Sequence, residues 1–289
     1  MLRTGAESWQ HEAMDATILV AAASSRTGVP MPRLMHVVLP AALIGCRPPP
    51  EAPAELEELT SWLYGRVETG SDEEMEVGLG NLVAWLDTRF EEATEGYTVD
   101  NLPEDIAHAA DGRSGPLEGL VGASVATRIG APFGDVAEAM LVHDQMEVFE
   151  GEYISFEREF ENDVRCFARG ECATEKARTQ SVNNYPLGLE LGVDFNTQWR
   201  WVEGPDGPTI VYRTWLRDQA DVNKDWLGVN YQYFLGVTMP RDGQTRRLQT
   251  TWIAASLGDT PVPEDMALNM VIDGMTNTDA TLETYLLGE

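Results

Sequence analysis

The stretch "SVATRIGAPFGDVAEAMLVHDQMEVFEGEYISFERE", Ser124 to Glu159, carries three hydrophobic patterns in succession. Together with the residues just before it, it gives an apolar run over 120–129 that is typical of a strand. Residues 135–149 then place apolar side chains at helical spacing. Residues 153–160 alternate apolar and polar side chains, which predicts a strand with one buried face. This order of strand, helix and strand governs how the rest of the chain is interpreted.

The sequence downstream predicts further strands and a closing helix. Candidate strands cover 187–202, 209–216, 229–239 and 246–257. The last two flank Asp242-Gly243, a dipeptide that favours a tight hairpin. A helix starts near Pro263 or Glu264 and need not be continuous, because Gly274 weakens its middle. Its apolar positions are Met266, Met270, Ile272, Leu282 and Leu286.

The sequence upstream, residues 54–116, predicts a helical segment. Leu56, Leu59 and Leu63 recur at the spacing of an amphipathic helix that ends near Gly70. Ser71 then starts a capping box with Glu74, and a second helix follows. Residues 97–116 are rich in glycine and proline and predict a loop region with at most a short helix over 106–110.

Ile129-Gly130-Ala131-Pro132, followed by a helix that bears Val136, resembles the opening of the START-like, helix-grip proteins of the SRPBCC superfamily. The resemblance covers residues 117–289. It implies an α+β domain in which a curved antiparallel sheet wraps on a long C-terminal helix. It also implies a cavity between sheet and helix for a lipid, sterol-like or aromatic ligand, or less often a cyclase or hydrolase site. The chain departs from the pattern at Phe149, which stands where a tryptophan is usual, and in a long insert over 166–181.

The predicted strands are rich in aromatic side chains that could line such a cavity. Alternation places Phe195, Thr197, Trp199 and Trp201 on one face of a strand, and Val229, Tyr231, Tyr233, Leu235 and Val237 on one face of another. Ligand pockets are largely apolar and aromatic. The candidate lining residues are therefore Trp199, Trp201, Trp215, Tyr231, Tyr233 and Trp252. Two alternatives stay open: these side chains fill a solid core, or the tryptophans beside Arg200 stack with it on the surface.

The stretch "MPRLMHVVLPAALIGCRPPPEAP", Met31 to Pro53, has the features of a secretory signal. Arg33 precedes a short apolar run that ends at Gly45, too short to span a bilayer as a helix. Leu43-Ile44-Gly45-Cys46 resembles the lipobox of bacterial lipoproteins, which implies that residues 31–45 are removed and that Cys46 is lipidated. Residues 46–53 then form a proline-rich tether, and residues 1–30 are interpreted as a mis-assigned upstream extension. In the alternative, the run is a buried segment whose cysteine is accidental.

Lipidation at Cys46 predicts a protein held in the cell envelope by its N-terminal lipid, with the membrane as a partner. The absence of aspartate at position 47 resembles the pattern of lipoproteins sorted to the outer membrane, facing the periplasm or the cell surface. The net charge of −28 excludes nucleic acid as a partner, because phosphate binding requires a basic face. Cys166 and Cys172 then remain as a pair, and in an oxidising compartment they are expected to form a disulfide.

The sequence offers little for metal binding or catalysis. The pair Cys166 and Cys172 lacks the spacing and the further ligands of a zinc site. Residues 221–225 resemble the start of a calcium loop, but Trp226 stands where glycine is required. The histidines that follow Cys46 are His108 and His143, and no convergent acid, base and nucleophile can be named. We therefore expect no metal and no cofactor, and binding without turnover.

Three functions are compatible with these patterns. The first is a membrane-anchored lipoprotein that binds a hydrophobic small molecule or lipid in a helix-grip cavity. The second is a structural or interaction lipoprotein with a solid core and no ligand. The third is an enzyme that resembles the polyketide cyclases. A cavity beneath the last helix would separate the first from the second.

Overall fold

The computed structural model describes residues 50–288, apart from 143 and 259. Cys46, the predicted signal and His143 lie outside the described residues. Within the described part of the chain, no helix is long and apolar enough to cross a membrane. Residues from Pro48 to Glu289 form one compact unit.

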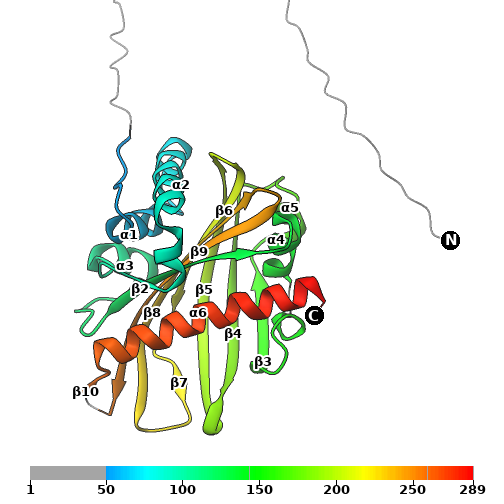
Figure 1. Ribbon diagram of the computed structural model, residues 1–289. Helices are drawn as coiled ribbons and strands as arrows, with labels where there is room; N and C mark the ends of the chain where they lie inside the picture. The colour runs from blue at the N-terminus through cyan, green and yellow to red at the C-terminus, as the bar shows by residue number, and fades with distance from the viewer. Residues whose placement is uncertain (1–49, 143, 259, 289) are drawn as a thin grey trace, which may run out of the picture. The chain divides into compact units, whose positions relative to one another are not determined.

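The fold is α+β, with a curved antiparallel sheet wrapped on a long C-terminal helix, as the sequence predicts (Figure 1). The main path of the sheet runs β1-β2-β9-β8-β6-β5-β4-β3, with β7 paired to β5 and β10 to β9. The strands are β1 (Tyr97–Val99), β2 (Val121–Ile129), β3 (Tyr153–Phe160), β4 (Thr174–Tyr185), β5 (Leu189–Gly204), β6 (Gly207–Leu216), β7 (Asp221–Val222), β8 (Leu227–Arg241), β9 (Gln244–Leu257) and β10 (Thr260–Pro261). The helices are α1 (Leu56–Arg66), α2 (Asp72–Thr94), α3 (Glu104–Asp111), α4 (Phe133–Leu141), α5 (Val164–Ala168) and α6 (Glu264–Leu287), with short 3-10 turns at η1 (Gln145–Glu147) and η2 (Pro186–Gly188).

Several local predictions are confirmed. Ser71 and Glu74 form the capping box at the start of α2. Asp242 and Gly243 adopt φ of 53° and 77° between β8 and β9, which makes the hairpin that their sequence favours. The closing helix is confirmed as α6, which is continuous through Gly274 although the sequence left a break there open.

Other local predictions are wrong. The helix predicted over 135–149 ends at Leu141, because Val142 is extended and the Asp144 carboxylate caps the separate turn η1 through the Met146 amide. The supposed insert over 166–181 contains the first two thirds of β4, a full member of the sheet. Residues 97–99, predicted as loop, form β1 on the edge of the sheet beside β2.

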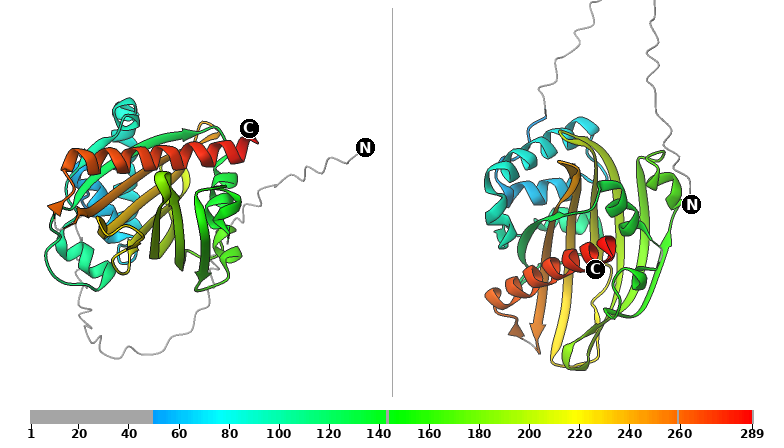
Figure 2. Two further views of the ribbon diagram at one scale, coloured as in Figure 1. Left: turned by 90° about the horizontal axis from the view of Figure 1, so that it is seen from below. Right: turned by 45° about the vertical axis from the view of Figure 1, so that its right-hand side comes forward.

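The two faces of the sheet carry different covers, and Figure 2 shows α6 across the hollow side. We call the face toward α6 the inner face and the opposite face the outer face. On the inner face, Ala267, Val271 and Met275 of α6 pack on Val125 of β2 and Ile253 of β9. Among the strands, α6 contacts mainly β2 and β9. The inner sides of β4 and β5 therefore lie away from the helix.

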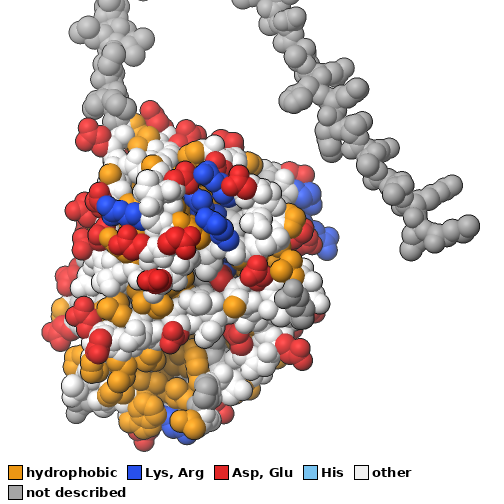
Figure 3. Space-filling view, viewed as in Figure 1, with side chains coloured by type: hydrophobic (Ala, Val, Ile, Leu, Met, Phe, Trp, Pro, Cys, Tyr) orange, Lys and Arg blue, Asp and Glu red, His pale blue; other side chains and the backbone are white. Residues whose placement is uncertain are grey.

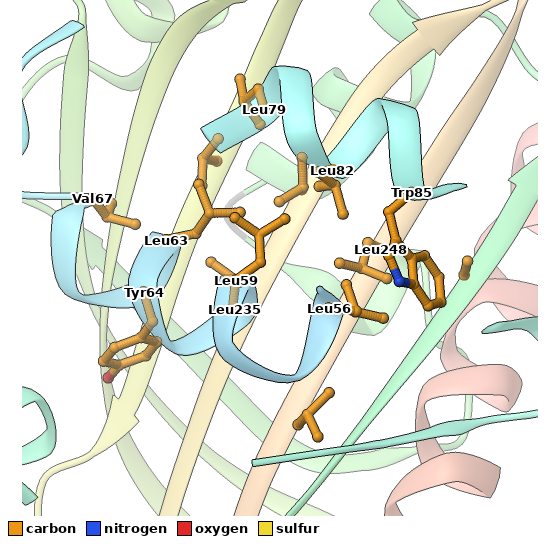
Figure 4. Close-up of a cluster of buried hydrophobic side chains, with 14 of the residues drawn as sticks. Leu56, Leu59, Leu63, Tyr64, Val67, Leu79, Leu82, Trp85, Leu235 and Leu248 are labelled. Carbon is orange, nitrogen blue, oxygen red and sulfur yellow. The ribbon is translucent and has the colours of Figure 1, made fainter. Parts of the chain in front are cut away.

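The outer face is covered by α1, α2 and α3. Leu56, Leu59 and Leu63 of α1 are fully buried in a cluster with Leu235 of β8 and Leu248 of β9 (Figure 4). Met75, Leu79, Leu82 and Leu86 of α2 belong to the same cluster. The helical segment over 54–116 therefore shares one hydrophobic core with the sheet.

Candidate functional site

The inner face contains an apolar trough that α6 covers only in part. Its surface consists of the partly exposed rings of Phe195 on β5 and Phe234 on β8, and beneath them lie the buried core side chains Val193, Leu216, Val229 and Ile253. The rings of Phe195 and Phe234 meet edge to face, with centroids 5.7 Å apart. Both phenylalanines are only partly buried, so each retains apolar surface that nothing described in the structure covers.

A second apolar surface lies at the start of α6. Figure 3 shows apolar side chains gathered along the first half of α6 and over the strand ends below it. In this part of the chain, Trp226 is 55% exposed, Met266 48%, Met270 52% and Leu257 38%. Contiguous exposed apolar surface is typical of binding sites, whereas single exposed side chains are ordinary. We call these four residues the mouth of the trough.

The middle of the inner face is polar and fixes α6 to the sheet. The Arg247 guanidinium of β9 donates to the Asp279 carboxylate of α6, and both side chains are buried. Thr127 of β2 also donates to Asp279, and the second Arg247 amine donates to the Tyr212 hydroxyl at 3.2 Å. Burial opposes the charge on Arg247, but Asp279 and Tyr212 outweigh it and raise the pKa of this guanidinium.

Tyr212 can occupy this place because β8 has a glycine beside it. A Cβ on Gly236 would lie 2.0 Å from the Tyr212 ring, so only glycine leaves room for the phenol to lie flat over β8. The inner face at this level is otherwise lined by threonines: Thr197 and Thr214 share a hydrogen bond of 2.9 Å. Polar groups thus lie between two apolar regions of one face.

Arg158 of β3 is a second cation on the inner face. Its Nε donates to the Thr179 hydroxyl at 3.2 Å, and one amine donates to the carbonyls of Met140 and Val142 at the end of α4. Its guanidinium carbon lies 5.0 Å from the centre of the Phe156 ring. Burial lowers the pKa of Arg158 to about 10.

The far end of the inner face is aromatic. Trp199 and Trp201 of β5 lie there with Phe160, Phe167 and Phe133. The Trp201 indole donates to the Phe167 carbonyl at 2.7 Å. A disulfide joins Cys166 to Cys172 beside this cluster, with Cα atoms 5.3 Å apart, and confirms the predicted pair.

The six predicted lining residues divide between the two faces. Trp199 and Trp201 lie on the inner face, at the aromatic end. Trp215, Tyr231, Tyr233 and Trp252 lie on the outer face and pack in the cluster beneath the N-terminal helices. These four side chains therefore do not line the space beneath α6. The physical reason is register: Trp215 pairs with Tyr233, and Tyr233 pairs with Trp252, which puts all three on the face that α1 covers.

The stacked Trp-Arg-Trp arrangement considered from the sequence does not form. Arg200 lies on the outer face, where it donates to the Gly70 carbonyl at 2.6 Å and to the Asp72 carboxylate at 2.5 Å. Trp199 and Trp201 point to the other side of the strand. Arg200 thus fastens the start of α2 to the sheet.

The outer face also holds a buried polar group that the sequence did not single out. The Asp111 carboxylate, whose side chain is fully buried, accepts from the Tyr233 hydroxyl at 2.6 Å and from Arg113 Nε at 2.8 Å. Burial alone would raise the pKa of Asp111, but the hydrogen bonds from Tyr233 and Arg113 lower it below its usual value. Arg113 in turn lies over the Tyr231 ring, 4.1 Å from its centre. This group joins the end of α3 to β8.

Two hollows lie elsewhere on the surface. One, of about 420 Å³, lies on β3, β4 and β5 and the loop after β6, and is bordered by Glu157, Asp194 and Asp218. The other, of about 550 Å³, lies at the aromatic end beside Trp201 and Phe133. Neither hollow includes a residue of α6. Among the residues that the structure describes, no group of three or more His, Cys, Asp and Glu side chains is placed to hold a metal ion.

The residues of the inner face that sequence reasoning missed are Phe234, Arg247, Asp279 and Arg158. Alternation along β3 already placed Arg158 with Phe156 and Phe160, and that was the available signal. For Arg247 and Asp279 no such signal exists, because their partnership joins a strand to a helix distant in sequence.

No protein-family model and no curated protein matches this chain. Solved structures of similar fold include a STAR-related lipid transfer protein from Xanthomonas axonopodis, with a TM-score of 0.39, 14% identity, and coverage of 60% of this chain and 96% of that one. A START superfamily protein from Mycobacterium smegmatis gives a TM-score of 0.37 and 11% identity, over 58% of this chain and 97% of that one. Human STARD10 gives a TM-score of 0.39 and 7% identity, over 66% of this chain and 82% of that one. These scores are low, so function is inferred below from this chain's own residues.

Proposed function

We propose that this protein binds a hydrophobic or amphiphilic small molecule in the apolar trough beneath α6, without chemical turnover, and that a lipid on Cys46 anchors it in the cell envelope. The observation that carries the binding proposal is the trough itself. Phe195 and Phe234 keep exposed apolar surface on the concave inner face of the sheet, and further exposed apolar surface lies at the start of α6. An apolar concavity with a few polar groups on its floor is the usual form of a small-molecule site.

The chemistry of the polar centre favours binding over catalysis. Arg247 and Asp279 use their charges on each other, Thr127 also donates to Asp279, and Arg247 also donates to Tyr212. A general base needs a free lone pair within reach of a substrate proton. The pair thus serves to hold α6 in place over the trough.

Binding can be tested with a charge placed in the trough. Phe195→Asp introduces a carboxylate among Val193, Leu216 and Phe234, and burying an unpaired charge against an apolar ligand is unfavourable. We expect the variant to lose at least about tenfold in affinity for an environment-sensitive fluorescent fatty acid. The matched control is Asn196→Asp, the next residue of β5, which faces the outer side. Equal binding by both variants and the unchanged chain would place any ligand outside the trough.

The anchor is tested separately. Cells that express the chain are labelled with a radioactive fatty acid, and the protein is followed through membrane fractionation. We expect label and membrane association in the unchanged chain and neither in Cys46→Ser, because stable anchoring requires acyl chains. Unlabelled protein that stays in the membrane fraction after Cys46→Ser would exclude this anchor and leave the trough proposal intact.

A further inference from the structure

Arg158 is partly buried, and it differs from the buried arginines of the described chain in having no acidic partner. Arg213 pairs with Glu68, Arg246 with Asp87, and Arg247 with Asp279. Arg158 forms no ion pair with any described residue, and its hydrogen bonds go to a hydroxyl and to two carbonyls, all of them neutral groups. A cation withdrawn from water without a counter-ion is costly, so the inner face carries positive charge that is only partly compensated.

The acidic residues nearest in sequence do not compensate this charge. Glu157 and Glu159 flank Arg158 on β3, but alternation points them to the outer face, where both are exposed. The groups that act on Arg158 electrostatically are the phenols of Tyr153 and Tyr212. In a chain with 48 acidic and 20 basic side chains, a cation that faces inward without an acid is unusual.

The sheet register places Arg158 level with the floor of the trough. Arg158 pairs with Thr179, Thr179 with Phe195, and Phe195 with Leu216, so the four residues form one row across β3, β4, β5 and β6. Neighbouring strands are about 4.8 Å apart, which puts the Phe195 backbone roughly 10 Å from that of Arg158. The Arg158 side chain bonds to Thr179 in the strand between them, and its guanidinium carbon lies 5.8 Å from the centre of the Trp199 ring on the strand of Phe195.

The Arg158 guanidinium also keeps donor capacity for a ligand. Nε donates to Thr179 and Nη1 to the carbonyls of Met140 and Val142, while Nη2 makes no hydrogen bond with the described residues. Nη2 is also not among the buried polar atoms without a partner, so it retains access to solvent or to a ligand. A guanidinium with a free amine suits a carboxylate or phosphate oxygen.

We propose that the ligand of the trough is an amphiphile with an anionic headgroup, whose apolar body lies on Phe195 and Phe234 and whose carboxylate or phosphate accepts a hydrogen bond from Arg158. This inference rests on the proposed function, because it assigns the ligand class of the same trough. It also gives the ligand a direction, with its headgroup at β3 and its tail toward the mouth.

The test compares ligands that differ only in the headgroup. Isothermal titration calorimetry with the full-length chain, stripped of copurified lipid, measures binding of dodecanoate, dodecanol and acetate. We expect dodecanoate to bind at least about tenfold more tightly than dodecanol, since a hydrogen bond to a charged group contributes about that factor. Acetate alone should give no measurable binding. Equal affinity for dodecanoate and dodecanol would overturn the role of Arg158 while supporting the trough, and no binding of either would overturn the proposed function itself.

A pair of variants assigns the preference to the residue. Arg158→Gln should reduce the ratio of the affinities for dodecanoate and dodecanol to near one. Arg178→Gln, on the outer face of the adjacent strand, should leave this ratio unchanged. Circular dichroism checks folding, because Arg158 also holds the end of α4. If Arg158→Gln does not fold, Arg158→Lys keeps a charge there and should retain the preference for the acid. A ratio that stays near tenfold in a folded Arg158→Gln protein, or acetate binding as tight as dodecanoate, would contradict the proposal.

Discussion

The Asp279 carboxylate accepts a hydrogen bond from the Arg247 guanidinium beneath the middle of α6, where the two side chains are 3% and 4% exposed. Because Thr127 also donates to Asp279 and Arg247 also donates to Tyr212, the pair acts as one unit that joins α6 to β2, β6 and β9. The position of α6 decides how much of the trough is open. The stability of this pair is therefore linked to the function proposed here.

Asp279→Asn removes one charge of this unit and leaves the Arg247 cation buried without a partner. We expect the free energy of unfolding to fall by about 3–5 kcal/mol, the usual cost of breaking a buried pair on one side only. Denaturation with urea measures the change. Asp273→Asn, an exposed position on the same helix, serves as control and should cost less than about 1 kcal/mol. Equal losses in the two variants would show that the pair does not hold α6.

Gly236→Ala tests the close approach of Tyr212 to β8. The added methyl would lie 2.0 Å from the phenol ring, so the ring must move and its contact with Arg247 is lost. We expect a loss of about 1–3 kcal/mol, typical of overpacking. Gly274→Ala on α6 has open space around its new methyl and should instead raise stability by up to about 1 kcal/mol. Thermal unfolding of the two variants should therefore shift in opposite directions.

Asp111→Asn tests the buried group that joins α3 to β8. The folded state lowers the pKa of this carboxyl, so the stability it contributes is present above the unfolded value of about 3.9 and is lost as the pH falls through the lower folded value. At pH 7 we expect the variant to lose about 2–3 kcal/mol, because Tyr233 and Arg113 lose a charged acceptor. At pH 3 the gap in free energy of unfolding between the variant and the unchanged chain should be smaller. A gap that is constant from pH 7 to pH 3 would mean that the charge on Asp111 is not what matters.

The disulfide gives a prediction for the aromatic end. Cys166 and Cys172 are separated by six positions, and a loop of this size contributes roughly 2 kcal/mol in the chain-entropy model. The double variant Cys166→Ser, Cys172→Ser should unfold at lower urea concentration by that amount. The unchanged chain treated with a reductant should match it. No change on reduction would show that the loop is held by the packing of Phe167 alone.

The sequence predicts much of the fold because most elements have an unambiguous hydrophobic period. Val121–Ile129 and Tyr153–Phe160 follow the predicted strands closely, and the capping box at Ser71 fixes the start of α2. The strand β4 was not predicted, because its inward positions Glu175, Ala177, Thr179 and Ser181 are polar or small and its outward positions are polar apart from Val182, which leaves no apolar alternation. Small inward side chains here make room for Arg158 and Trp199.

The site was predicted less well than the fold. Alternation along one strand shows which side chains share a face, but it cannot say which faces of two strands match. Trp199 of β5 pairs with Tyr212 of β6, so these two side chains share the inner face. Trp215 is three residues from Tyr212 on the same strand and therefore lies on the opposite face. The prediction also did not place the N-terminal helices on the outer face of the sheet. Once α1 and α2 are placed there, Trp252 and Tyr233 belong to the core beneath them.

The measurement that tests the central claim most directly is native mass spectrometry of the full-length chain purified from envelope membranes, followed by organic extraction and lipid analysis. We predict one additional mass per chain that disappears on denaturation and that the extract identifies as an amphiphile, and we predict its absence from Phe195→Asp. A chain that carries no additional mass, and that remains unchanged after incubation with a total lipid extract, would contradict the binding function and favour a structural or interaction role.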